Sequence, residues 1–370
     1  MGAVFKGKGR EMTLTILFWI LVIPVTLVLG LIAEWVVRKV SALVQWRVGP
    51  PLFQPVYDVM KLMGKEILIP QEANKTVFLL APLVGLVGVL LLSVILWWTL
   101  IIQSESGQIL IGDVIVAIYL MVLPSLALIL GGSSSASPHA SVGTAREMKL
   151  VIGYELPLVL AFVVVIIKTM GFVEQGQQLS LYAISNQEYA PVLSISGMLA
   201  FLVALLCIQA KAGFVPFDIA EAETELGSGI LMEYSGALLG LWKLMHAVML
   251  VALPLFLVAI FMGGYGAIHL SGTGLIVAVV LLLIFVIGRF LSGRSKFMDI
   301  LAILSFIAVC IMAGLGKYVL ILVLMILIKN TNPRLRIDQA LKFFWVYCFV
   351  AMIAAIILAS VGYYYDIGWL

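Results

Sequence analysis

The stretch TVFLLAPLVGLVGVLLLSVILWWTLI, residues 76–101, contains no charged side chain. A helix rises about 1.5 Å per residue, so about 20 mainly apolar residues are enough to cross the hydrocarbon core of a membrane. This stretch therefore predicts a transmembrane helix.

The rest of the 370-residue chain has the same character. Hydrophobic residues make up 63% of it and charged residues 11%, whereas soluble domains have about 45–50% and about 25%. Water cannot solvate so apolar a chain, which excludes a soluble enzyme and a disordered protein. The net charge of +3 is also too small for a nucleic-acid-binding surface. The composition predicts an all-α, polytopic membrane protein.

Apolar runs of similar length predict the other spans. All the predicted spans lie near 12–34, 76–101, 113–131, 150–170, 193–212, 231–262, 273–291 and 341–364. The stretch 299–330 is also apolar, but Gly314 to Lys317 interrupt it, so it forms either one long helix or a short hairpin. No repeat or linker divides the chain, so we expect one integral membrane domain over residues 1–370.

The distribution of lysine and arginine predicts the orientation in the cell membrane. Segments 35–75, 289–298 and 331–342 are rich in both residues, whereas 102–112 and 263–272 contain neither. Basic loops stay on the cytoplasmic side, so we expect the first three segments to face the cytoplasm. Placing 289–298 and 331–340 on one side favours a hairpin at 299–330 and ten crossings.

Acidic residues cluster in segment 213–230, which we expect to be a cytoplasmic loop. Asp218, Glu221, Glu223 and Glu225 alternate there with small and aliphatic residues. On a helix, three of these carboxylates would share a face, and their repulsion would raise at least one pKa far enough for proton transfer. A solvated acidic loop is the alternative interpretation.

Ionisable residues inside predicted spans are costly and often functional. Glu233, Lys243 and His246 fall in span 231–262 and form a candidate proton path, although hydrogen bonds between packed helices are the alternative. Glu155 lies in span 150–170 just before Pro157, which frees a backbone carbonyl and makes room for polar groups.

The segment 37–75 is expected to be a cytoplasmic loop that contains an amphipathic helix after Gln54-Pro55. That helix is either an interfacial anchor or a docking face for a soluble partner. Arg47, Asp58 and Lys61 are candidates for ion pairs with such a partner.

Together these motifs resemble a known family, the H subunit of respiratory complex I and its counterpart in the group 4 membrane-bound nickel–iron hydrogenases. The resemblance covers most of the chain in order. The matching blocks are Arg38-Lys39, Gln45-x-Arg47-x-Gly49-Pro50, Gln54-Pro55-x-x-Asp58-x-x-Lys61, Lys65-Glu66, Arg146, Tyr154-Glu155-x-Pro157, Pro216-Phe217-Asp218-Ile219-x-Glu221-x-Glu223-x-Glu225, Glu233-Tyr234-Ser235-Gly236 and Asn332-Pro333-Arg334-x-Arg336-x-Asp338-Gln339.

The resemblance implies eight family transmembrane helices, with an extra helix or hairpin near 299–330. It implies a subunit that is not catalytic alone: it anchors a soluble electron-transfer arm and couples it to H⁺ or Na⁺ translocation. The implied coupling residues are Glu155, Lys211, Asp218, Glu221, Glu223, Glu225, Glu233, Lys243 and His246. The implied docking residues are Arg38, Arg47, Asp58, Lys61, Arg146, Arg334, Arg336 and Asp338.

Departures from the complex I pattern favour the hydrogenase branch, which includes sulfur-reducing complexes. The loop from Gly49 to Pro55 is shorter than in complex I, and Lys211 and His246 stand where that family has Glu. The expected partners are hydrogenase-like large and small subunits, an iron–sulfur subunit and antiporter-like membrane subunits. A quinone-binding H subunit of a complex I-type dehydrogenase is the runner-up, and a stand-alone transporter is disfavoured because no internal repeat is visible.

We expect no metal or redox cofactor in this chain. Its three cysteines (Cys207, Cys310 and Cys348) lie singly in apolar runs, and its three histidines (His139, His246 and His269) are far apart. Neither spacing suits a metal or iron–sulfur site, so we expect iron–sulfur clusters only in partner subunits.

Overall fold

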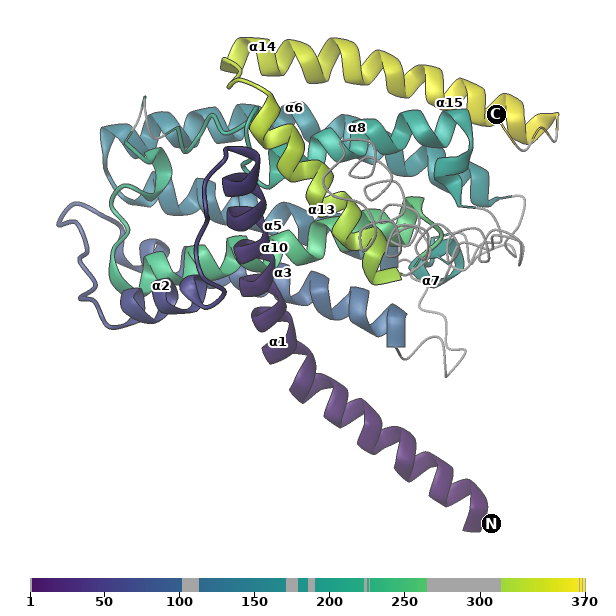
Figure 1. The fold of residues 1–370 in the computed structure, drawn as a ribbon, viewed down its shortest axis with the longest axis horizontal. Helices are drawn as coiled ribbons and strands as arrows, with labels where there is room; N and C mark the ends of the chain where they lie inside the picture. The colour runs from purple at the N-terminus through teal and green to yellow at the C-terminus, as the bar shows by residue number, and fades with distance from the viewer. Residues whose placement is uncertain are drawn as a thin grey trace, which may run out of the picture. The chain divides into compact units, whose positions relative to one another are not determined.

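The computed structural model describes residues 2–101, 113–170, 179–185, 190–222, 227–264 and 314–365, together with Glu225, Ile367 and Trp369. These residues form helices, turns and irregular loops, and no strand occurs among them. The predicted all-α class is confirmed (Figure 1).

The chain falls into two compact units. Unit 1 comprises Met1–Ile102, Val116–Met148 and Asp218–Leu253, and unit 2 comprises Gln103–Ile115, Lys149–Phe217 and Pro254–Leu370. The expectation of one integral membrane domain stays a prediction.

Unit 1 contains α1 (Gly2–Val44), α2 (Gln54–Met63), α3 (Lys75–Ile101), most of α5 (Asp113–Ser134), the start of α6 (Pro138–Thr169) and the first part of α10 (Gly236–Phe261). Glycines let these helices approach closely. A Cβ at Gly85 of α3 would lie 2.6 Å from Met245 Sδ of α10, and one at Gly88 would lie 2.7 Å from Leu123 Cβ of α5. The apolar sequences thus explain both the helices and their tight packing.

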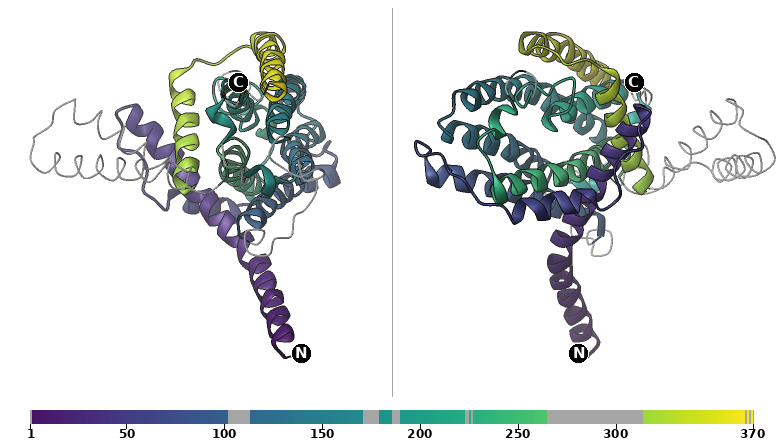
Figure 2. Two further views of the ribbon diagram at one scale, coloured as in Figure 1. Left: turned by 90° about the vertical axis from the view of Figure 1, so that its right-hand side faces the viewer. Right: turned by 60° about the vertical axis from the view of Figure 1, so that its left-hand side comes forward.

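Unit 2 contains most of α6, then α7 (Leu181–Ser185), α8 (Ile195–Lys211), α13 (Gly314–Thr331), α14 (Ile337–Lys342) and α15 (Phe349–Tyr364). A π-helical turn, Phe343–Cys348, joins α14 to α15. The Ser194 side chain caps α8 by accepting a hydrogen bond from Gly197 N–H over 3.1 Å. α15 packs along α8, as Figures 1 and 2 both show.

Six described helical segments are long and apolar enough to cross a membrane: Ile20–Val44, Lys75–Thr99, Asp113–Ser134, Pro138–Thr169, Gly236–Phe261 and Ile337–Tyr364. α8 is a shorter apolar helix of 17 residues. These seven match predicted spans, and the chain is a multi-pass membrane protein. Span 273–291 and residues 299–313 of the predicted hairpin lie outside the described residues, so the count of eight is not tested.

Several helix boundaries differ from the prediction. α1 spans Gly2–Val44 instead of 12–34, and α6 begins at Pro138 instead of near 150. Hydropathy detects only the apolar part of a helix, whereas backbone hydrogen bonds can continue it through polar residues. α10 is shorter than predicted, because it begins at Gly236 and the apolar run begins near 231.

Candidate functional site

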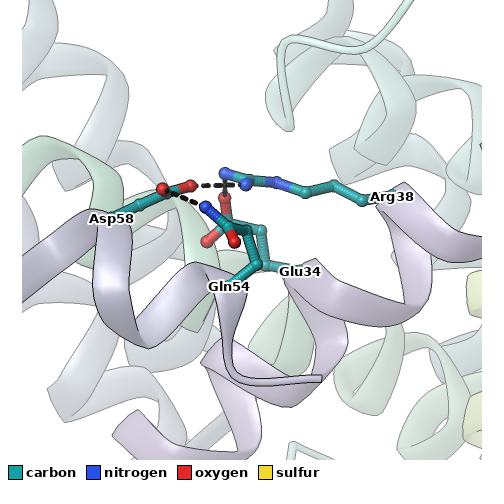
Figure 3. Close-up of polar contacts among 4 residues, drawn as sticks. All are labelled: Glu34, Arg38, Gln54 and Asp58. Atoms are coloured by element: carbon teal, nitrogen blue, oxygen red, sulfur yellow. Dashed lines mark hydrogen bonds and ion pairs between the residues drawn. The ribbon is translucent and has the colours of Figure 1, made fainter. Parts of the chain in front are cut away.

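A network of four side chains joins α1 to α2. Arg38 on α1 donates a hydrogen bond to Asp58 Oδ2 over 2.6 Å and another to Glu34 one turn earlier. Gln54 donates to the other Asp58 oxygen over 3.0 Å. Figure 3 shows the Arg38 guanidinium reaching both carboxylates. Asp58 therefore has an ion-pair partner within its own chain, which the sequence did not reveal.

Lys243 of α10 adds a further charge to this network. Gly240, one turn earlier, faces α2, where a Cβ would lie 3.5 Å from Leu62 Cβ. The pKa of Asp58 is lowered from its ordinary value of 3.8, chiefly by the hydrogen bond from Arg38 and to a smaller extent by the Lys243 charge. Two carboxylates and two cations from three helices thus gather in unit 1; we call Glu34, Arg38, Asp58 and Lys243 the charge cluster.

The loop between α1 and α2 is held against α1 by two hydrogen bonds. Trp35 Nε1 donates to Pro50 O over 3.2 Å, and Lys39 Nζ donates to Val48 O over 2.7 Å. Beyond these anchors, Trp46 is 97% exposed and the Arg47 side chain is also exposed. Lys61 is exposed on α2. The loop therefore has a fixed base and an exposed outer face.

The acidic loop is anchored to α6 within unit 1. Arg146 donates to Glu225 Oε2 over 2.7 Å and makes a longer contact of 3.5 Å with Ile219 O. Gly229, with a φ of +50°, packs so close to Ala220 that a Cβ there would lie 2.1 Å from its carbonyl oxygen. The loop is thus folded back on itself and packed.

The carboxylates of this loop do not share a helical face. Residues 218–222 form bends and irregular backbone, so the expected helical spacing of Asp218, Glu221 and Glu225 is wrong. Small residues that pack the loop against α6, such as Ala220 opposite Gly143, favour this compact turn over a helix. Asp218 and Glu221 are partly buried and Glu225 is exposed. Glu223 lies outside the described residues.

Glu155 and Lys211 meet in unit 2. Lys211 Nζ donates to Glu155 Oε2 over 3.0 Å, and the lysine side chain is wholly buried. The ammonium also lies 5.3 Å from the centre of the Tyr154 ring. Glu155 Oε1 is buried and has no hydrogen-bond partner within the described part of the chain.

The structure does not place all three ionisable residues of the predicted span 231–262 on one helix. Lys243 and His246 lie on α10 and are partly buried, but Glu233 precedes the helix. The sequence placed all three on one helix because the apolar run begins near residue 231. Tyr234, next to Glu233, donates to Phe78 O over 3.2 Å, and burial raises its pKa to about 12.

The last group of predicted docking residues lies before and within α14. Arg334, Arg336 and Asp338 are exposed. Leu335 N–H donates to Pro216 O over 3.0 Å, which fixes this segment beside the chain that follows α8. These three docking residues therefore form a short exposed stretch of unit 2.

Two buried polar residues were missed by the sequence analysis. Lys317 is fully buried and donates to Met262 O and Gly264 O over 2.9 and 3.0 Å. Gln209 is fully buried and donates to Val215 O and Met325 O over 3.0 and 3.1 Å. The signal in the sequence that could have revealed them is that each polar residue lies in an apolar run.

In the described ranges no three His, Cys, Asp or Glu side chains form a metal-binding group; the absence of a cofactor stays a prediction.

Comparison with known proteins identifies the family. The chain is 29% identical over 356 residues to the NADH-quinone oxidoreductase H subunit of Dehalococcoides mccartyi (strain CBDB1), covering 94% of this chain and 85% of the relative. It resembles a chain of the membrane-bound sulfane sulfur reductase, an archaeal respiratory membrane complex, with a TM-score of 0.71 and 25% identity, covering 93% of this chain and 99% of that one. The model of the NADH dehydrogenase family matches residues 16–360. The chain therefore belongs to the NADH dehydrogenase family.

Proposed function

We propose that this chain is the membrane-anchor and coupling subunit of an energy-converting respiratory complex of the hydrogenase or sulfur-reducing type. It holds a soluble electron-transfer arm and links that arm to H⁺ or Na⁺ translocation. The single observation that carries the proposal is the charge cluster, because it connects α2, which lies in the predicted cytoplasmic segment 37–75, to the Lys243 charge on α10.

The docking surface supports the anchoring role. Trp46, Arg47, Val48, Phe53 and Lys61 form it, and all are exposed around a loop whose base is tied to α1. Exposed aromatic and arginine side chains in one patch are typical of the centres of protein interfaces. A fixed loop loses little conformational entropy when a partner binds it.

The charge cluster supports the coupling role. A partner that binds Arg47 or Lys61 changes the field at Asp58, which lies on the same helix as Lys61 and already senses both Arg38 and Lys243. Charges in a low-dielectric region shift one another's protonation over several ångströms. A redox event in the docked arm can therefore act on the ionisable side chains of α10, Lys243 and His246, through the electric field alone. No movement of the backbone is needed.

The acidic loop and the Glu155–Lys211 pair extend this role. Asp218, Glu221, Glu223 and Glu225 would form the coupling loop, with Glu233 at its end. Glu155, whose buried Oε1 has no hydrogen-bond partner within the described residues, would be a member of the proposed proton path. Lys211 in unit 2 and His246 in unit 1 are further members of the proposed coupling set.

The relatives support the presence of partner subunits in general. A chain similar to a subunit of a respiratory membrane complex is itself expected to work with partner subunits. We propose nickel–iron-hydrogenase-like large and small subunits, an iron–sulfur subunit and antiporter-like membrane subunits, with every iron–sulfur cluster in those partners. Arg334, Arg336, Asp338 and Arg146 are further contact residues.

A second candidate function is quinone binding, favoured by the similarity to a subunit of NADH-quinone oxidoreductase. The short loop from Gly49 to Pro55 argues against a long quinone tunnel. Quinone reduction by the purified assembly would favour this candidate over the first.

Co-purification tests the proposed function. Affinity-tagged chain should bring down soluble iron–sulfur subunits and membrane subunits that mass spectrometry can identify. Arg47→Glu and Lys61→Glu should each reduce recovery of the soluble subunits while the membrane subunits remain. Lys75→Glu is the matched control, because Lys75 is exposed but lies outside the docking surface. Full recovery and activity in both docking variants would contradict the proposal.

A further inference from the structure

A crevice of about 380 Å³ lies in unit 2 between α6 and α14. Lys149 and Ile152 of α6 line one side, and Leu341, Lys342 and Trp345 line the other. The crevice is open to the surroundings, and its wall is apolar. Lys149 and Lys342 line it with the aliphatic parts of their side chains, and no polar atom contributes to its wall. Both lysine side chains are exposed, so we place their ammonium groups at the rim of the crevice.

Close packing beside the crevice fixes its shape. A Cβ at Gly153 would lie 3.2 Å from Leu341 Cδ2, so α6 and α14 nearly touch at that position. Tyr154 packs edge-on against Phe344, with ring centres 6.3 Å apart. Lys149, one turn before Gly153, lies where the two helices separate.

The π-helical turn exposes the tryptophan of the crevice. Phe344 is fully buried in the turn Phe343–Cys348, whereas the next residue, Trp345, is 53% exposed. A π-helical turn is rare and occurs often at functional sites. Within this turn Trp345 lines the crevice while its neighbour Phe344 fills the core.

Within the described residues, no ion pair compensates the charges of the two crevice lysines. Neither Lys149 nor Lys342 forms an ion pair with any residue of the described ranges, and Asp338, one turn before Lys342, does not pair with it. Lys342 belongs to segment 331–342, whose basic residues predict a cytoplasmic position. Lys149 follows Arg146 in the basic stretch between the predicted spans 113–131 and 150–170, for which the same rule predicts the cytoplasmic side. Two positive charges over an apolar wall match a ligand with an anionic head and a hydrocarbon tail.

We propose that this crevice binds an anionic membrane phospholipid. The phosphate lies between Lys149 and Lys342, and the upper part of an acyl chain packs on Ile152, Leu341 and Trp345. Basic crevices between helices on the cytoplasmic side suit anionic headgroups, and tryptophan is common at the membrane–water interface. Free phosphate would use the two charges but leave the apolar wall without a partner. The bound lipid would join α6 to α14.

Native mass spectrometry of the delipidated, detergent-purified complex tests the proposal. Phosphatidylglycerol is titrated into the wild type and into Lys149→Ala/Lys342→Ala, and the variant should bind it about tenfold more weakly or not at all. The control, Lys65→Ala/Lys75→Ala, removes two exposed lysines elsewhere and should bind like the wild type. Phosphatidylcholine should bind weakly to all three. Equal phosphatidylglycerol binding by the wild type and the crevice variant would overturn the proposal.

Two further experiments distinguish a bound lipid from other occupants of the crevice. Inorganic phosphate at millimolar concentration should not displace phosphatidylglycerol; displacement would indicate a site for the free anion and overturn the proposal. A photo-reactive benzoylphenylalanine in place of Trp345 should form a lipid adduct when the complex in native membranes is illuminated. An adduct with another protein subunit instead would show that a protein covers the crevice and would also overturn the proposal.

Discussion

Lys211 Nζ lies 3.0 Å from Glu155 Oε2, and this ion pair places a fully buried lysine beside a carboxylate that is 22% exposed. The two residues are 56 positions apart in sequence, on α8 and α6. Taking two charges out of water costs free energy, and their pairing offsets a large part of that cost. We therefore treat the pair as a single unit: each residue makes the burial of the other tolerable.

Removing only the lysine should be more harmful than removing both charges. Lys211→Met leaves Glu155 without its cation and should lower the free energy of unfolding by about 3–5 kcal/mol. Lys211→Met combined with Glu155→Gln should recover most of this loss, because no uncompensated charge remains. Denaturation of the purified protein in detergent measures both. A single variant as stable as the wild type would show that the pair contributes nothing.

Asp58 should make the contact between α1 and α2 depend on acid pH. Its pKa is lowered below 3.8, chiefly by the Arg38 hydrogen bond, so the folded state favours the ionised form. The resulting stabilisation is present above the ordinary pKa and is lost as pH falls through the lowered value. Melting temperatures of wild type and Asp58→Asn should therefore differ at pH 6 and converge below about pH 3.8. A difference that stays constant with pH would refute this assignment.

The Arg146–Glu225 pair should matter more for coupling than for stability. Glu225 is 60% exposed, and exposed ion pairs contribute only about 0–1 kcal/mol. We expect Glu225→Gln to change the melting temperature little but to reduce ion transport per electron, because it releases the acidic loop from α6. Glu72→Gln, which removes another exposed carboxylate, serves as the control. Reduced stability with normal transport would indicate a purely structural pair.

The sequence predicted the apolar helices well because long uncharged runs leave few other structures available in a membrane. It could not predict where helices continue past the apolar run, which is why Arg38 and Arg146 lie on helices instead of in loops. Pairs such as Arg38–Asp58 and Lys211–Glu155 depend on how distant helices pack. No spacing in the sequence carries that information.

The same limit explains why the sequence did not predict the backbone conformation of the acidic loop. Its charge density was visible in the sequence, but its backbone is set by contacts such as that between Gly229 and Ala220. A helical spacing therefore gave the wrong geometry for Asp218 and Glu221. Lys317 was visible only as an interruption, although its hydrogen bonds to Met262 and Gly264 show it to be part of the packed interior.

The number of ions moved per electron in reconstituted vesicles tests the central claim most directly. Lys243→Met and Glu221→Gln should each leave electron transfer running at a reduced rate while that ratio falls, because they remove charges of the charge cluster and the acidic loop. Lys75→Met, which removes an exposed lysine, should leave the ratio at the wild-type value. An unchanged ratio in both Lys243→Met and Glu221→Gln would contradict the coupling role and leave these charges only a packing function.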